Sequence, residues 1–254
     1  MVFSPRQSVE IFHLVFLRAL VAKGEDKALI ALKGGCNLRF CFGSARYSED
    51  MDCDVAVIAK GTLRNKVDRL LASPLVTTPL RSKGIELIEH SAPKQTDTTQ
   101  RWKIGLRVAG TNAPVRTKVE FSRRAVIEGT TLAVLDSEVM RAYGLTPFAA
   151  THYTVGAAIA QKIQALAGRS EPQARDVFDL DLLLSRSDAA PLKLDASAKR
   201  GVADAIERAL SISFDHYRSH VVAYLHSEQA ELFASRAAWD AMQETVIARL
   251  QALQ

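Results

Sequence analysis

Three aspartates, Asp50, Asp52 and Asp54, alternate with apolar residues in the stretch DMDCDVAVIA at residues 50–59. Side chains alternate in direction along a β-strand, so this spacing places the three carboxylates on one face. Aspartate is uncommon in strands, and like charges about 4 Å apart repel by roughly 4 kcal/mol at an effective dielectric near 20. A divalent cation removes that repulsion. The stretch indicates either the solvated side of a half-buried strand or a carboxylate site for metal ions.

A glycine pair lies upstream of these aspartates. The stretch KALIALKG (27–34) predicts a short buried strand, and CNLRFCFG (36–43) predicts a short helix, with Gly34 and Gly35 at the turn between them. Glycine permits positive φ and close approach of a ligand, and the N–H groups that open a helix can bind a phosphate. Most glycine pairs mark only turns. Here the order of elements predicts a phosphate site that precedes an acidic strand.

The remaining pattern predicts a small sheet with helices, followed by a helical half. Two more helices are expected in the first part, at residues 6–23 and 62–73. Apolar-polar alternation predicts strands at residues 83–92, 101–110, 115–124 and 131–136. Later helices are expected at residues 154–168, 172–186, 197–212, 214–225 and 228–252. The fold class is therefore α+β, with a mixed-sheet domain at residues 1–148 and a helical domain at residues 149–254.

A third acid for metal chemistry is offered by the stretch RTKVEFS. Glu120 and Lys118 share one face of the expected strand, whereas Val119 and Phe121 share the other. Two-metal phosphoryl transfer uses carboxylates from more than one element, and Glu120 would supply one. The alternative is an edge strand on which Lys118 and Glu120 form a salt bridge with each other.

Composition sets broad limits on function. The chain has 254 residues, 48% of them hydrophobic and 24% charged, which is typical of a globular protein. A net charge of +5 permits an anionic partner such as RNA or a nucleotide but does not require one. Cys36, Cys41 and Cys53 lack zinc-ligand spacing and indicate reduced thiols in the cytoplasm. The N-terminal apolar run contains His13 and Arg18, so no membrane span is expected.

The run LKGGCNLRFCFGSARYSEDMDCDV (32–55) resembles the signature of AbiEii/AbiGii-type toxins, which belong to the DNA polymerase β-like minimal nucleotidyltransferase superfamily. That signature reads Lys-Gly-Gly, a hydroxyl residue, a short helix, then Arg-Phe-Ser-Glu-Asp-hydrophobic-Asp. The resemblance implies a polymerase β-like nucleotidyltransferase domain whose active site is completed by the helical domain. It implies that three carboxylates are catalytic metal ligands: Asp50, Asp52 and Glu120. It implies nucleotide binding by Lys33, Gly34, Gly35 and Cys36.

Two residues in this run differ from the family pattern or fall outside it. Cys36 stands where the family usually has a hydroxyl, and a thiol is a weaker hydrogen-bond donor, so weakened phosphate binding is expected. Asp54 follows the metal-binding pair and is expected either to support it from behind or to lie in solvent. Gly43 and Ser44 follow the short helix and are expected to form a loop, not the phosphate-binding turn.

A second run, AIAQKIQALAGRSEPQARDVFDLDLLL (158–184), is similar to the family's later motif. The resemblance implies that Lys162 is catalytic and contacts the triphosphate. It implies that Arg175 and the catalytic Asp176 hold the site together or contact the substrate. Taken without the resemblance, these residues fit an exposed lysine and an Arg-Asp pair near a helix N-terminus, where the helix dipole favours an acid.

The resemblance implies a toxin of a toxin–antitoxin or phage-defence pair, with a cognate antitoxin encoded nearby. The implied reaction uses Mg²⁺, or Mn²⁺ in its place, and transfers NMP from an NTP to an acceptor with release of pyrophosphate. The expected acceptor is RNA, with the 3′ end of tRNA favoured. Two alternatives stay open: the acceptor is a protein or a small molecule, or the chain is a catalytically weakened module that binds RNA or a partner, an alternative motivated by Cys36.

Overall fold

The computed structural model describes residues 3–22, 24–186 and 194–254, without the side chains of residues 25, 26, 227 and 228. It divides the chain into two compact units. The sheet unit comprises Met1–Gly43 and Tyr47–Tyr153. The helical unit comprises Thr154–Gln254 together with the short segment Ser44–Arg46, which belongs to it by its contacts.

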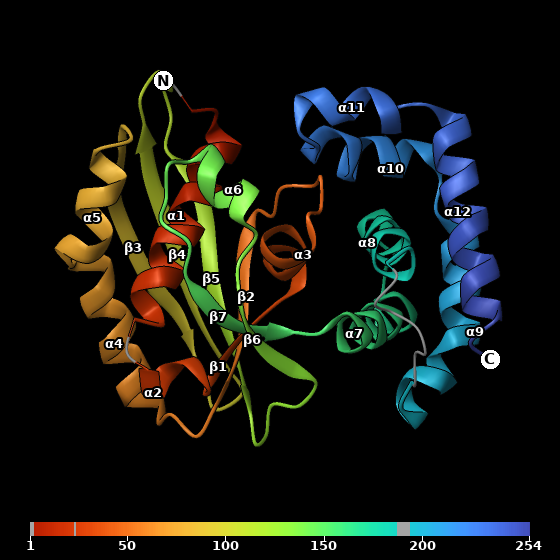
Figure 1. Cartoon of the computed structure of the whole chain (residues 1–254), viewed down its shortest axis with the longest axis horizontal. Coiled ribbons are helices and arrows are strands. Elements are labelled where there is room, and N and C mark those ends of the chain that lie inside the picture. The colour runs from red at the N-terminus through yellow and green to blue at the C-terminus, as the bar shows by residue number, and fades with distance from the viewer. Residues whose placement is uncertain (1–2, 23, 187–193) are drawn as a thin grey trace. The chain divides into compact units, whose positions relative to one another are not determined.

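A seven-stranded mixed sheet forms the centre of the sheet unit, and the expected α+β class is confirmed (Figure 1). Its strands are β1 (Ile30–Lys33), β2 (Asp50–Ala56), β3 (Ile85–Gln95), β4 (Thr99–Val108), β5 (Val115–Arg124), β6 (Thr130–Val134) and β7 (Ala149–Tyr153). The strand order is β3-β4-β5-β2-β1-β7-β6. Strand β2 runs parallel to β5, and β1 runs parallel to β7, whereas the other neighbours are antiparallel.

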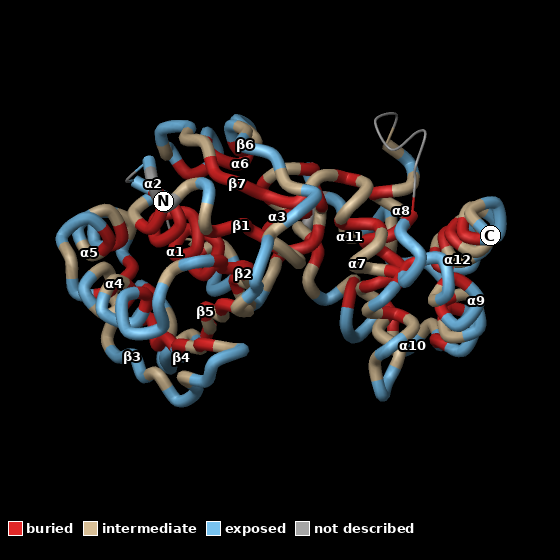
Figure 2. Tube along the Cα trace, turned by 90° about the horizontal axis from the view of Figure 1, so that it is seen from below, coloured by how far each residue is buried: buried red, intermediate tan, exposed pale blue. Residues whose placement is uncertain are grey.

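Helices cover the apolar face of this sheet (Figure 1). They are α1 (Pro5–Leu20), α2 (Gly24–Lys27), α3 (Gly34–Phe42), α4 (Lys60–Ala72), α5 (Pro74–Arg81) and α6 (Ser137–Ala142). Helix α1 begins at a capping box, because Ser4 accepts from the Gln7 amide and the Gln7 side chain accepts from the Ser4 amide. Buried residues follow α1 and the central strands in Figure 2, and the core of the unit lies between them.

The helical unit packs two pairs of helices against each other. Its helices are α7 (Val155–Gly168), α8 (Ala174–Leu184), α9 (Ala196–Ser211), α10 (Phe214–His220), α11 (Ser227–Phe233) and α12 (Arg236–Gln251), with a 3-10 turn at Val222–Tyr224. Helix α7 contacts α9, and helix α8 contacts α12. Tyr217 stacks on Trp239 with ring centroids 4.5 Å apart, and both rings are fully buried. None of the described helices is both long and apolar enough to cross a membrane.

Several expected boundaries were wrong. The helix expected at 228–252 is two helices, because Ser235 interrupts it and accepts a hydrogen bond from the Ala238 amide as the cap of α12. The helix expected at residues 62–73 is followed directly by a further helix, α5, which Pro74 opens after the cap Ser73. Residues 149–153, which the expected domain boundary assigned to the helical half, form the strand β7 and pair with β1 and β6. The first helix ends at Leu20, and the expected last residue, Lys23, lies outside the described residues.

Candidate active site

Parallel pairing of β2 with β5 brings the three predicted carboxylates together. Asp52 lies directly beside Glu120 in the register, and Asp50 lies beside Lys118. Neighbouring strands are about 4.8 Å apart, and paired residues project to the same face. Because β5 lies between β4 and β2, the alternative of an edge strand is wrong. The partner of Glu120 is Arg101 on β4, not Lys118.

Two of these carboxylates are paired with cations. Lys118 Nζ lies 2.7 Å from Asp50 Oδ2, and Arg101 Nε donates to Glu120 Oε2. Among the described residues, no three metal-ligating side chains already form a cluster. Asp50 and Glu120 each face a cation. Any metal ion that binds here has to displace these two side chains.

Asp52 differs from its neighbours because it has no ion-pair or hydrogen-bond partner in the described part of the chain. Burial raises the pKa of Asp52, the nearby Asp50 and Glu120 carboxylates raise it further, and Lys33 and Lys118 oppose them. A carboxylate in such surroundings gains the most from a bound cation. The electrostatics therefore favour metal binding at Asp52.

The predicted glycine turn lies against this carboxylate. Gly34 has a φ of +65°, and a Cβ at Gly34 would stand 3.3 Å from Asp52 Oδ2. Only glycine combines this conformation with this closeness at little cost. Helix α3 starts at Gly34, and no described side chain caps its N-terminus. Its first amides are therefore available for an anion beside Asp52.

Lys33 and Asp54 form a buried pair. Lys33 Nζ donates to Asp54 Oδ1 at 2.6 Å and to Ser122 Oγ at 2.8 Å. Asp54 is 3% exposed and also accepts from Tyr153 Oη at 2.5 Å and from Arg124 Nε at 3.3 Å. The expectation that Asp54 could lie in solvent is wrong. Asp54 holds Lys33, so this lysine is partly neutralised next to the glycine turn.

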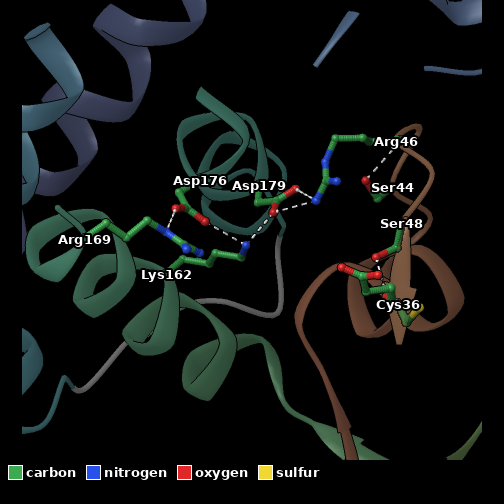
Figure 3. A network of polar contacts seen from close by, with 9 residues as sticks. Cys36, Ser44, Arg46, Ser48, Lys162, Arg169, Asp176 and Asp179 are labelled. Atoms are coloured by element: carbon green, nitrogen blue, oxygen red, sulfur yellow. Dashed lines mark hydrogen bonds and ion pairs between the residues drawn. The ribbon is translucent and has the colours of Figure 1, made fainter. Parts of the chain in front are cut away.

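Cys36 lies inside the sheet unit and does not face a ligand. Its thiol is 1% exposed, donates to the Asp50 carbonyl at 3.3 Å, and lies 3.6 Å from His13 Nδ1. Burial raises the pKa of this thiol well above its usual value, so it stays protonated. Ser48 Oγ donates to the same carbonyl at 2.8 Å (Figure 3). With its thiol buried, Cys36 offers its backbone amide to a phosphate, and not its side chain.

A buried histidine supports the start of β2. Thr117 Oγ1 donates to the Glu49 carbonyl at 2.6 Å, so it accepts from His13 Nε2 at 2.8 Å. His13 therefore carries a proton on Nε2, and the effect of burial on its pKa keeps the ring neutral at pH 7. Burial lowers the pKa of His13 to about 3. Sequence reasoning missed this contact because His13 lies on an amphipathic helix far along the chain from Thr117.

The second predicted motif forms a buried charge network in the helical unit (Figure 3). Lys162 Nζ lies 3.0 Å from Asp176 Oδ1 and 2.6 Å from Asp179 Oδ2. Arg169 Nε pairs with Asp176 at 2.8 Å, and Arg46 Nη2 pairs with Asp179 at 3.1 Å. Both carboxylates are fully buried. The alternative of an exposed lysine is wrong, because the Lys162 side chain is only 12% exposed.

Pairing outweighs burial in this network. Burial lowers the pKa of Lys162, but Asp179 and Asp176 more than compensate, so that pKa is raised. Burial likewise raises the pKa of Asp176, and Lys162 and Arg169 reverse the shift, so that pKa is lowered. Lys162 and Asp176 are therefore both charged at neutral pH. Arg175, by contrast, is half-buried and has no partner among the described residues.

One family model matches most of the chain. The family model described as "Nucleotidyl transferase AbiEii toxin, Type IV TA system" matches residues 15–252. No match was found among curated proteins.

Three solved structures share the fold. A putative nucleotidyltransferase from Helicobacter pylori is 18% identical with a TM-score of 0.64, over 100% of this chain and 99% of that one. JHP933 from the same organism is 18% identical with a TM-score of 0.62, over 99% and 96%. MenT4, a nucleotidyltransferase toxin from Mycobacterium tuberculosis, is 17% identical with a TM-score of 0.65, over 98% and 85%.

Proposed function

Because this chain belongs to the AbiEii family of nucleotidyl transferase toxins, we propose that it transfers NMP from an NTP to RNA, with the 3′ end of tRNA as the favoured acceptor. The proposed metal is Mg²⁺, with Mn²⁺ able to replace it. The observation that supports this most is the glycine turn against Asp52, next to the paired Glu120. A phosphate site and a carboxylate site thus adjoin on neighbouring strands.

The residues present fit a divalent cation. Carboxylate oxygens are the ligands that Mg²⁺ and Mn²⁺ prefer, and Asp50, Asp52 and Glu120 supply them from two rigid strands. Gly34 leaves open the space beside Asp52 that a side chain would fill. Such ions, when bound, neutralise phosphate charge and favour in-line attack at phosphorus.

The chain's own residues then position the nucleotide. We propose that the opening amides of α3, at Gly34, Gly35 and Cys36, donate to the phosphate oxygens. Lys33 adds positive charge beside this turn while Asp54 fixes its position. Because the Cys36 thiol is buried, its difference from the family's hydroxyl gives no reason to expect a lost phosphate contact.

The helical unit contributes two cations in different ways. Lys162 has three N–H donors, and the two aspartates of its network can take two of them, so one remains for a phosphate oxygen. Arg175 has no partner in the described parts of the chain and offers its guanidinium group. We propose that both bind phosphate oxygens of the nucleotide, and that Asp176 holds Lys162 in place.

The family name identifies the toxin of a type IV toxin–antitoxin system, so an antitoxin partner is expected. We propose that its gene lies nearby. A neighbouring gene that encodes a small protein and that suppresses toxicity on co-expression would support this.

Label transfer tests the proposed reaction. The purified protein is incubated with Mg²⁺ and each α-labelled NTP in turn, with total RNA as acceptor, and Asp52→Ala serves as the inactive control. The expected result is metal-dependent labelling of tRNA by the wild type alone. Equal labelling by both proteins would contradict the assigned site. Labelling of protein or of a small molecule, with none of RNA, would contradict the acceptor.

A further inference from the structure

The polar face of the sheet unit continues beyond the carboxylates as a row of cations across neighbouring strands. Asp50 on β2 lies beside Lys118 on β5, and Lys118 lies beside Lys103 on β4. Lys103 in turn lies beside Ser91 on β3. Paired residues project to the same face, so this row leads from a proposed metal ligand toward the edge of the sheet.

A second row runs parallel to the first. Asp52 lies beside Glu120, Glu120 lies beside Arg101, and Arg101 lies beside Lys94 on β3. The two rows together place four cations on β5, β4 and β3. We call these four residues the cation band: Lys94, Arg101, Lys103 and Lys118. At about 4.8 Å between strands, the band starts beside the carboxylates and reaches roughly 10 to 15 Å from β2.

A cavity of about 650 Å³ opens over this region, lined by Asp50, Lys118 and Lys103 among others. Arg116 and Glu89, which also line the cavity, pair with each other across Gly105 of β4. A Cβ at Gly105 would stand 2.6 Å from Glu89 Cγ. The absence of a side chain there lets the ion pair lie flat across β4. The surface is therefore hollowed and polar next to the proposed metal site.

The members of the cation band differ in how available they are. Lys94 and Lys103 are exposed and have no partner among the described residues. Lys118 and Arg101 are paired with Asp50 and Glu120, the same carboxylates that a metal ion would use. Metal binding therefore frees these two cations next to two that are already free.

The geometry of in-line phosphoryl transfer indicates which of the two substrates lies next to the cation band. The attacking and leaving oxygens of a phosphoryl transfer lie on opposite sides of the phosphorus. The glycine turn, the proposed phosphate site, follows β1 on one side of β2. The cation band lies on the other side of β2, beyond β5. The acceptor hydroxyl should therefore approach from the side of the band.

We propose that the cation band binds the phosphodiester backbone of the RNA acceptor just behind its reacting end. This inference rests on the proposed function and adds to it the surface that holds the acceptor. Lysine and arginine contacts to phosphates are independent of base sequence and depend on salt. The band thus contributes affinity and position, whereas the choice of RNA depends on other contacts.

The test compares two charge reversals of equal size. Lys103→Glu removes a member of the band, and Arg69→Glu alters an exposed cation on α4, which covers the opposite face. Trp102, which alternates with Lys103 on β4, donates to Asp68 of α4 at 2.7 Å, and this contact establishes that the faces are opposite. Binding of a fluorescent hairpin RNA with a single-stranded 3′ tail is measured in EDTA without NTP. Lys103→Glu should weaken binding about five- to tenfold and lower the salt slope by about one.

Arg69→Glu should change that affinity less than twofold. Equal losses in both variants, or no loss in Lys103→Glu, would overturn the inference. Competition by polyglutamate as strong as that by RNA would overturn the assignment to RNA.

Transfer assays keep the inference separate from the proposed function. Lys103→Glu should raise the KM for RNA and leave the KM for NTP unchanged. If the wild type transfers NMP to RNA and this variant matches it in both constants, the band is not the acceptor surface. If RNA binding depends on Lys103 but no NMP is transferred, the proposed reaction fails while the binding surface stands.

Discussion

The sheet unit and the helical unit both carry groups of opposite charges, but they hold them differently. On the sheet, Asp50 and Glu120 are 31% and 20% exposed, and each has one cation partner in the described chain. In the helical unit, Asp176 and Asp179 are fully buried, and each pairs with two cations. Exposed single pairs exchange partners easily, whereas buried doubly paired charges do not. The carboxylates of the sheet site are therefore suited to accept ions, and those of the helical network are suited to hold Lys162 in place.

The largest difference between the regions should appear in stability. Asp176→Ala leaves Lys162 and Arg169 each short of a partner in a buried network, so a loss of about 3 to 5 kcal/mol in the free energy of unfolding is expected. Asp50→Ala should change it by less than about 1 kcal/mol. Urea unfolding of both variants measures this. Equal losses would remove the distinction between the two regions.

Acid should lower the free energy of unfolding through His13, which supports the start of β2. The pKa of His13 is about 3 in the fold and about 6.5 when the chain is unfolded. Below pH 6.5 the unfolded chain therefore binds a proton that the folded chain does not, and stability falls as pH falls toward 3. Between pH 7 and pH 5 this loss is about 2 kcal/mol.

His13→Gln retains a donor for Thr117 without this titration, so its stability should vary less over the same range. The raised pKa of Asp52 acts in the opposite direction in both proteins and cancels in the difference between them. Urea unfolding at several pH values tests this. Identical pH slopes for the two proteins would contradict a buried neutral histidine.

A smaller effect is expected at the counter-ions of the sheet site. Lys118→Met removes the cation that a metal must displace from Asp50, so metal affinity should rise about two- to fivefold. Unfolding stability should change by about 0.5 kcal/mol or less. Calorimetric titration with Mn²⁺ measures the affinity. A weaker affinity in this variant would mean that Lys118 assists the metal and does not compete with it.

The local sequence pattern was sufficient to predict the strand and the helix that carry the candidate site. Alternation along residues 50–54 predicted the strand β2, and the glycine pair predicted a turn from strand to helix, because both depend on neighbouring residues. Helix α3 itself begins at Gly34, two residues before the expected start at Cys36. The partners of these residues could not be predicted in the same way. Tyr153, which donates to Asp54, is 99 residues away, and Thr117 is 104 residues from His13. Such contacts depend on strand order, which periodicity does not specify.

The same limit explains the reassignment of Cys36. Its position after two glycines suggested a side chain that faces a ligand, but the direction of the thiol depends on how α3 packs beside α1 and β2. Lys162 is a similar case, because an isolated helix pattern cannot show that Asp176 and Asp179 enclose it. The sequence was sufficient to select the candidate residues. Their burial and their partners could be known only from the fold.

Metal binding by Asp52 tests the central claim most directly. Mn²⁺ titration followed by electron paramagnetic resonance is performed on the wild type, on Asp52→Asn, and on Asp97→Asn, which alters an exposed aspartate of the same unit. The wild type and Asp97→Asn should bind Mn²⁺ with equal affinity, and Asp52→Asn should bind at least tenfold more weakly. Equal affinity in all three proteins would contradict the assignment of the metal site to β2 and β5.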